Sequence, residues 1–220
     1  MKKVTCFFTI TILCLAFCCS VHAQIPSVEA KITINKTNNH SGGELQVVYA
    51  AGNKKSGKFI RPLIIAEVYD PADILKGQTA INLAYVCEEY PQLVTNITEL
   101  LYYDIIYLNY NDGVDDIFRN AQLLEAAIDT VNARKGTNEQ NVVLGVSMGG
   151  LVARYCLASM EKRGKDHQTR KYISLDVPHK GANVPVGFQA AIRDLRTLNV
   201  TVFRQTIDPM QQHLKAQLHF

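Results

Sequence analysis

The 220-residue chain is long enough for one globular domain, with 47% hydrophobic and 20% charged residues. Its formal charge of +3 includes Lys2 and Lys3; without them, 21 basic residues (23 minus 2) face 20 acidic ones. A balance so close to neutral gives no reason to expect a nucleic-acid partner or an acidic lipid surface.

The first 23 residues have the pattern of a secretory signal peptide. Lys2 and Lys3 precede an uncharged, mostly apolar stretch over residues 4–19, and Val21-His22-Ala23 offers small residues before Gln24. A lipoprotein or an uncleaved anchor is a weaker alternative, because the cysteine context is poor and the apolar stretch is short. We expect an exported protein, periplasmic, cell-surface or extracellular, with no transmembrane helix after cleavage.

Four of the six cysteines lie in that signal, which leaves Cys87 and Cys156. Two cysteines in an exported protein can pair. The expected fold places them on helices that cover opposite faces of a sheet, so two buried free thiols are the stronger prediction. No Cys/His cluster has metal-ligand spacing, and we expect no metal and no cofactor.

Residues 24–59 form a β-rich lead-in to the same domain. Val28 to Ile34 alternates apolar and polar residues, Leu45–Tyr49 is a second apolar run, and residues 38–43 form a turn cluster between them. This pattern predicts a hairpin. Residues 52–59 nearly match a phosphate-binding loop, but Phe59 replaces the metal-binding hydroxyl and a strand follows instead of a helix. We interpret this segment as a solvated loop.

The rest of the chain, residues 60–220, alternates predicted strands and helices. Buried apolar runs predict strands over 62–66, 103–110, 142–144 and 172–175. Helical patterns lie within 74–90, 94–101, 117–133 and 148–163, with stops at Pro91, Gly136 and Gly164. Such alternation predicts an α/β fold: a mostly parallel sheet with helices on both faces, preceded by the N-terminal hairpin.

The stretch from Asn141 to Met160 organises this arrangement. A buried strand leads into Gly145-Val146-Ser147-Met148-Gly149, a G-x-S-x-G pattern, and a helical segment follows. This is the context of a nucleophile elbow, in which a serine is held on a tight strand-to-helix turn. Gly145 and Gly149 remove side chains that would collide there, and the helix N-terminus supplies N–H groups. The alternative is a glycine-rich turn with an incidental serine.

Two motifs together resemble the α/β-hydrolase superfamily, specifically its lipase-like serine esterases. They are Gly-Val-Ser-Met-Gly-Gly-Leu-Val-Ala-Arg at 145–154 and Pro-His-x-Gly at 178–181. The resemblance covers roughly residues 62–191. It implies that Ser147 is the nucleophile and that the backbone N–H groups of Tyr69 and Met148 form the oxyanion hole. Glu67-Val68-Tyr69 stands where such lipases usually have His-Gly-aromatic.

The partners of the serine are harder to assign. Asp176 follows the strand after the elbow helix, a position that some lipases use for the catalytic acid, although most use the next strand. His179 resembles a structural feature near the substrate entrance more than a base. The remaining candidates after Ser147 are Asp166, Asp194, Asp208, His167, His213 and His219. Because only 43 residues follow Val177, we expect a hydrolase fold incomplete at its C-terminus and lacking its catalytic histidine.

The leading hypothesis is therefore hydrolysis of a small-molecule or lipid carboxylic ester through Ser147. Acyl transfer or peptide cleavage would use the same machinery. The alternative is a non-catalytic hydrolase-fold fragment, or a binding module that lacks the triad histidine.

Overall fold

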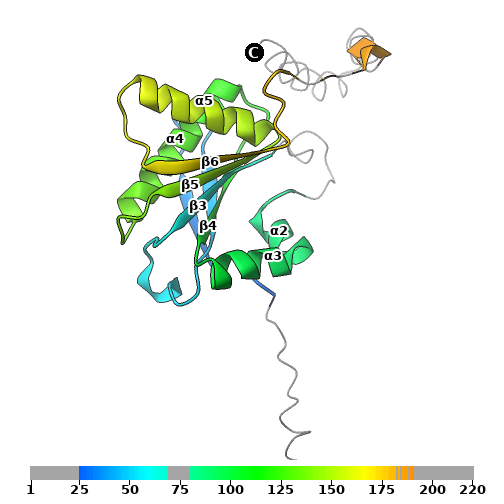
Figure 1. Cartoon of the computed structure of the whole chain (residues 1–220). Helices are drawn as coiled ribbons and strands as arrows, with labels where there is room; N and C mark the ends of the chain where they lie inside the picture. The colour runs from blue at the N-terminus through cyan, green and yellow to red at the C-terminus, as the bar shows by residue number, and fades with distance from the viewer. Residues whose placement is uncertain (1–24, 69–79, 182, 184, 188, 191–220) are drawn as a thin grey trace, which may run out of the picture.

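The computed structural model describes residues 25–68, 80–181, 183, 185–187, 189 and 190. The predicted signal peptide, Tyr69 and the candidates Asp194, Asp208, His213 and His219 lie outside these residues. The described part has three layers, with a central sheet, α4 and α5 on one face, and α2 and α3 on the other (Figure 1).

Six strands form one sheet. They are β1 (Ala30–Ile34), β2 (Gly43–Val48), β3 (Pro62–Ala66), β4 (Asp104–Tyr110), β5 (Asn141–Val146) and β6 (Thr169–Leu175). Their order across the sheet is β1-β2-β4-β3-β5-β6. β1 pairs antiparallel with β2, and β2 antiparallel with β4, whereas the pairs β3–β4, β3–β5 and β5–β6 are parallel. The predicted mostly parallel sheet with an N-terminal hairpin is confirmed.

The helical segments lie between the strands. They are η1 (Lys54–Ser56), α2 (Leu83–Glu89), α3 (Pro91–Thr95), η3 (Asn96–Leu100), α4 (Ile117–Arg134) and α5 (Met148–Lys162). Asp116 caps α4, because its side chain accepts a hydrogen bond from the Phe118 N–H at 2.7 Å. No helix in the described residues is both long enough and apolar enough to cross a membrane.

Some boundaries differ from the sequence prediction. The helix expected within 74–90 is found as α2, which begins at Leu83 behind an Asn82 cap. The helix expected over 94–101 starts earlier, because Pro91 occupies the first turn of α3, where its missing N–H costs nothing. The next turn, η3, is a π-helix. The loop at 52–59 is not wholly solvated, since Asn53 and Phe59 are buried.

Two apolar clusters flank the sheet. The larger lies under α4 and α5 and contains Ile64 and Val143, and the smaller lies under α2 and α3 and contains Leu63. Edge strand β6 is less covered: Ile173 is 41% and Leu175 56% exposed. The central strands, which lead to the elbow, are therefore the best-buried part of the sheet.

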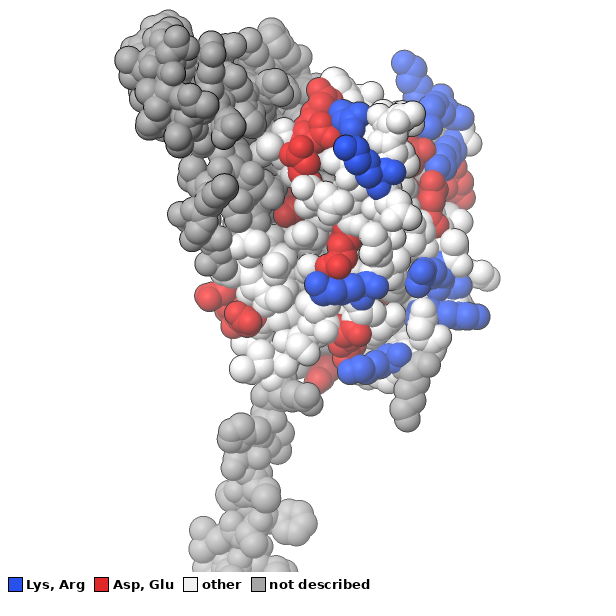
Figure 2. All heavy atoms as spheres, turned by 180° about the vertical axis from the view of Figure 1, so that it is seen from behind, with Lys and Arg blue, Asp and Glu red and all other residues white. Residues whose placement is uncertain are grey.

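On the face drawn in Figure 2, acidic and basic side chains are interspersed without a patch of one sign.

The two described cysteines are buried free thiols, as predicted. Cys87 on α2 packs in the smaller cluster and Cys156 on α5 in the larger, so the sheet separates them. Burial raises the pKa of the Cys87 thiol to about 11, helped by the negative charge of Glu88. Burial raises the pKa of Cys156 still further. Both thiols are therefore protonated and inaccessible in the folded protein.

We predict that these thiols resist alkylation until the protein unfolds. A rise in pKa from 9.0 to about 11 leaves about 100-fold less thiolate near pH 8. Iodoacetamide at pH 8 should modify the peptides that carry Cys87 and Cys156 at least about 100-fold more slowly in buffer than in guanidinium chloride. Peptide-resolved mass spectrometry measures both rates, and equal rates in the two conditions would contradict the buried positions.

Candidate active site

Ser147 occupies the turn between β5 and α5. Its backbone has φ 49° and ψ −124°, a conformation that few residues other than glycine adopt. Such strain persists only where the surroundings enforce it. Here the Ser147 N–H donates to the Leu175 carbonyl of β6 at 3.0 Å, and its carbonyl accepts from the Gly150 N–H at 3.1 Å. The side chain is half-buried and does not cap the helix, so its hydroxyl is not used by the helix itself.

Three glycines allow neighbouring segments to approach this turn closely. A Cβ on Gly145 would lie 2.4 Å from the Gly150 Cα, so the strand and the helix touch through their backbones. A Cβ on Gly149 would lie 2.4 Å from the carbonyl oxygens of both Ala66 and Glu67. The elbow is therefore packed directly on the carboxyl end of β3.

The third glycine, Gly150, allows α5 to pack closely against the segment after β6. A Cβ on Gly150 would lie 2.1 Å from a methyl carbon of Val177. The Tyr172 hydroxyl donates to the Gly150 carbonyl at 2.8 Å. The first turn of α5 is thus held by β3 on one side and by β6 with its exit on the other.

The two predicted oxyanion donors are Met148, within the elbow itself, and Tyr69, after β3. Met148 is the first residue of α5 and is fully buried; the N–H groups of a first helical turn have no acceptor within the helix. Tyr69 lies outside the described residues, which end here with Glu67 and the half-buried Val68. The oxyanion role of Met148 and Tyr69 stays a prediction.

Asp176 directly follows β6, with an exposed side chain and φ 50°. The preceding residue, Leu175, bonds the Ser147 N–H, so Asp176 belongs to the same edge of the sheet as the elbow. Aspartate adopts such left-handed backbone angles more readily than most residues. Its role as the catalytic acid stays a prediction.

Neither described histidine after the elbow is hydrogen-bonded to Ser147. His179 Nε2 lies 2.8 Å from Ser174 Oγ, and its Nδ1 is buried without a hydrogen-bond partner in the described part of the chain. His167 Nδ1 accepts from the Thr169 N–H at 3.0 Å, at the amino end of β6. Parallel β5 and β6 place that end at the edge opposite the elbow, so His167 and its neighbour Asp166 are separated from Ser147 by the length of the sheet.

The structure adds a hydrogen bond between two buried residues, Glu67 and Tyr110, that the sequence patterns did not indicate. The carboxylate of Glu67, 1% exposed, accepts from the Tyr110 N–H at 2.5 Å. Tyr110 is itself buried at the end of β4, and burial followed by the charge of Glu67 raises the pKa of its phenol well above the ordinary value. The sequence signal that could have indicated Glu67 is its position: a charged residue that directly follows the apolar strand at 62–66.

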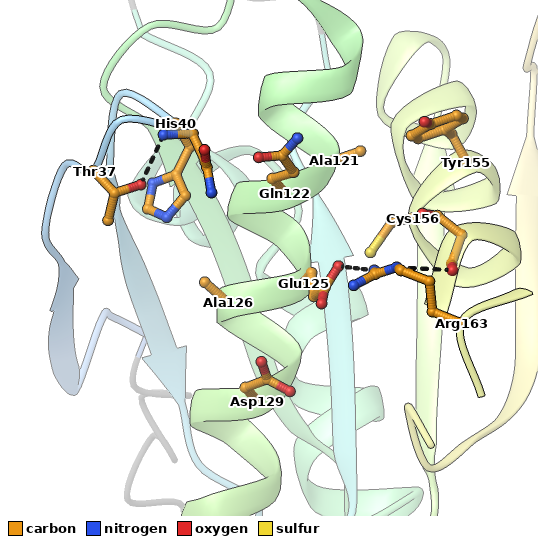
Figure 3. A pocket seen from close by; sticks show the side chains of 12 residues that line it. Thr37, His40, Ala121, Gln122, Glu125, Ala126, Asp129, Tyr155, Cys156 and Arg163 are labelled. Atoms are coloured by element: carbon orange, nitrogen blue, oxygen red, sulfur yellow. Dashed lines mark hydrogen bonds and ion pairs between the residues drawn. The ribbon is translucent and has the colours of Figure 1, made fainter. Parts of the chain in front are cut away.

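A hollow of about 560 Å³ lies away from the elbow, over the outer face of α4 and α5 (Figure 3). Thr37 and His40 line it from the loop after β1, Gln122 and Glu125 from α4, and Tyr155 from α5. Burial, and then the positive charge of Arg119, lower the pKa of His40. The residues that line this hollow do not include Ser147 or Asp176.

An ion-pair cluster closes one side of that hollow. Arg163 pairs with Glu125, and Lys165 Nζ lies 2.9 Å from Glu125 Oε1 and 2.6 Å from Asp129 Oδ2. Partial burial opposes ionisation of Glu125, but the bonds from Arg163 and Lys165 outweigh it, so its pKa is lowered. These charges neutralise one another and connect α4 to the end of α5. In the described residues, no group of three or more His, Cys, Asp or Glu side chains is placed to hold a metal ion.

Comparison with known proteins agrees with this architecture. The family model of lecithin:cholesterol acyltransferase matches residues 114–192, a segment that contains the elbow, Asp176 and His179. No curated protein matches the chain.

Solved structures show the same fold. An esterase from Rhizomucor miehei superposes with a TM-score of 0.52 at 13% identity, covering 84% of this chain and 54% of the esterase. A thermostable esterase from Pseudomonas putida gives a TM-score of 0.52 at 16% identity, covering 90% of this chain and 57% of the esterase. The chain thus spans little more than half the length of these proteins. It has the fold of these esterases, an α/β-hydrolase fold, and its residues 114–192 are similar to the lecithin:cholesterol acyltransferase family.

Proposed function

We propose that the chain is a serine hydrolase of carboxylic esters with Ser147 as its nucleophile. The observation that supports this most is the strained turn: a non-glycine residue at φ 49° between a buried strand and a helix N-terminus. A structural turn at this position would favour glycine, whereas a nucleophile elbow requires a serine there, between a strand and a helix N-terminus. This geometry supports the proposed role of Ser147.

In the proposed reaction, Ser147 Oγ attacks the ester carbonyl carbon while a base takes its proton. The backbone N–H groups of Met148 and Tyr69 stabilise the oxyanion of the tetrahedral intermediate, each worth about 3 kcal/mol in the transition state. Collapse releases the alcohol and leaves an acyl group on Ser147, which water then removes. Asp176 is the candidate acid that orients the base, and the base itself is unassigned among the described residues.

Hydrolysis of p-nitrophenyl esters of increasing acyl length tests this proposal. The folded wild-type chain should release p-nitrophenol above the buffer rate, and Ser147→Ala should return the release to the buffer rate. Ser159→Ala is the matched control, because Ser159 lies on the same helix but lines the hollow over α4 and α5; it should keep wild-type activity. A folded wild-type chain without activity would favour the non-catalytic binding module, and an active Ser147→Ala would exclude Ser147 as the nucleophile.

Acyl transfer is a second candidate, favoured by the acyltransferase family match over residues 114–192. The acyl group would pass from Ser147 to an alcohol instead of water, through the same intermediate. Adding a short alcohol to the ester assay separates the two: a transferase forms the new ester in preference to the free acid, whereas a hydrolase forms mainly the acid.

A further inference from the structure

A second hollow, of about 350 Å³, lies beside edge strand β6, at the amino ends of the parallel strands. Leu63 and Val142 line it from the second positions of β3 and β5. Ile97 of η3 and Leu101, which follows η3, form another part of its lining. Ser147 follows the opposite end of β5. This β6 hollow is therefore separate from the candidate active site.

The β6 hollow is an open continuation of the smaller core cluster. Leu63 and Val142 are buried in that cluster, and Ile97 packs against it. Its outer lining stays in contact with water, since Leu101 is 54% and Ile173 of β6 41% exposed. Single exposed apolar side chains are common, but these two line one hollow together. The hollow thus offers apolar surface that a bound ligand would remove from water.

A β-bulge brings two cations to this hollow. Along a regular strand, consecutive side chains point to opposite faces, yet Arg170 and Lys171 both line the β6 hollow. The pairing of β6 with β5 passes from Thr169 directly to Lys171, so Arg170 is an extra residue in the strand. An extra residue of this kind changes the direction of its side chain. The irregularity therefore places two neighbouring positive charges at one site.

The charges at the β6 hollow are of one sign. Among the described residues, no Asp or Glu lines it, and neither Arg170 nor Lys171 forms an ion pair. Arg170 Nη2 donates to the hydroxyl of Tyr103, another lining residue, at 2.7 Å. The Arg61 guanidinium lies over the same ring, 4.3 Å from its centroid. The hollow over α4 and α5 differs, because charges of both signs line it.

We propose that the β6 hollow binds the carboxylate form of a medium-chain fatty acid. The alkyl chain would lie on Leu63, Val142 and Ile173, and the carboxylate would bind Arg170 and Lys171. A guanidinium has five N–H donors, so the bond to the Tyr103 hydroxyl leaves others for the ligand. Bonds from such cations to a carboxylate are about twice as strong as bonds between neutral groups.

The volume of the hollow limits the length of the ligand. Small-molecule sites typically enclose about 300–1,000 Å³, and about 350 Å³ is near the lower limit. A chain of about eight to ten carbons therefore suits the hollow better than a long-chain lipid. The near-neutral charge of the whole chain does not oppose this ligand, because the two cations act locally.

Methyl NMR on the full chain measures both the affinity and the place of binding. Hexanoate, octanoate and decanoate are titrated at pH 7, below the concentrations at which they form micelles. The methyl signals of Ile97 and Ile173 should shift, whereas those of Ile34 and Ile117, in the larger cluster, should not. Decanoate should bind with a Kd of about 1 mM or lower. Each methylene removed from the chain should weaken binding by up to about fourfold.

Charge variants test the recognition of the carboxylate. Arg170→Ala/Lys171→Ala should weaken decanoate binding at least about 10-fold, whereas Arg170→Lys/Lys171→Arg keeps both charges and should stay within about threefold of the wild type. Lys36→Ala/Lys162→Ala is the matched control, because it removes two exposed cations that do not line the hollow; it should bind like the wild type. Should the first variant fail to fold, Ile173→Glu places a repelling carboxylate at an exposed position and should abolish binding.

Two ligand comparisons complete the test. 1-Octanol has the chain length of octanoate without its charge and should bind at least about 10-fold more weakly. Ser147→Ala should bind decanoate like the wild type, which separates the β6 hollow from an acyl site at the elbow.

Four results would overturn the inference. They are equal affinities for octanoate and 1-octanol, wild-type affinity in Arg170→Ala/Lys171→Ala, shifts confined to methyl groups outside the hollow, and binding to phosphatidylserine vesicles without binding of free decanoate. The last result would assign the surface to an anionic membrane instead. Because binding is measured directly, a wild-type chain without esterase activity would contradict the proposed function and not this inference.

Discussion

Gly149→Ala is expected to destabilise the protein by about 3 kcal/mol or more and to abolish the reactivity of Ser147. The added Cβ would lie 2.4 Å from the carbonyl oxygens of Ala66 and Glu67, and neither backbone group can move aside without shifting β3. Overpacking in a rigid core costs about 1–3 kcal/mol or more. Alanine is favoured over glycine in a helix by only about 1 kcal/mol, so the steric cost dominates.

Gly136→Ala is the control for this variant. Its added Cβ would lie 3.3 and 3.4 Å from two carbons of the exposed Lys58 side chain and 3.9 Å, an ordinary contact distance, from the Phe59 carbonyl oxygen, so a small shift of Lys58 accommodates it. Denaturant unfolding should give Gly136→Ala a stability within about 0.5 kcal/mol of the wild type. A Gly149→Ala chain as stable as Gly136→Ala would show that the elbow does not pack on β3 as described.

Gly150→Ala should be nearly as damaging as Gly149→Ala, but for a different reason. Here the added Cβ would lie 2.1 Å from one methyl carbon of Val177 and 2.9 Å from the other. The obstacle is a side chain on the segment after β6, not a strand backbone. We expect a loss of about 2–3 kcal/mol, because Val177 is partly packed against the larger core cluster and cannot turn away freely.

A second substitution should rescue this variant. Val177→Ala removes both methyl carbons and leaves its Cβ 3.0 Å from the new one, so Gly150→Ala/Val177→Ala should be more stable than Gly150→Ala alone. The coupling energy from the double-mutant cycle should favour the pair by at least about 1 kcal/mol. Val177→Ala should give no such rescue to Gly149→Ala. Additive losses in the first pair would contradict the contact between α5 and the exit of β6.

The elbow was predictable from the sequence because its signals are local. The apolar run after Asn141, the glycines around Ser147 and the helical spacing that follows all lie within 20 residues. Their structural counterparts, β5 and α5, begin within one residue of the predicted positions. The prediction also gave the reason for Gly145, which the structure places against Gly150.

The contacts that surround the elbow were not predictable in the same way. Gly149 packs on Ala66 and Glu67, which lie more than 80 residues earlier, and no periodicity encodes that meeting. From the sequence, Glu67 is only a replacement for the usual histidine, because its bond to the Tyr110 N–H depends on β3 and β4 being neighbours. Long-range pairings of this kind come from the order of strands in the sheet.

The position of Ser147 as nucleophile is tested most directly by locating a covalent adduct. The folded chain is treated with a fluorophosphonate and digested, and tandem mass spectrometry assigns the site of the added phosphonyl group. We predict a single stoichiometric adduct on Ser147, absent after prior unfolding and absent in Ser147→Ala. An adduct on another residue, or a folded wild-type chain that remains unmodified, would contradict it.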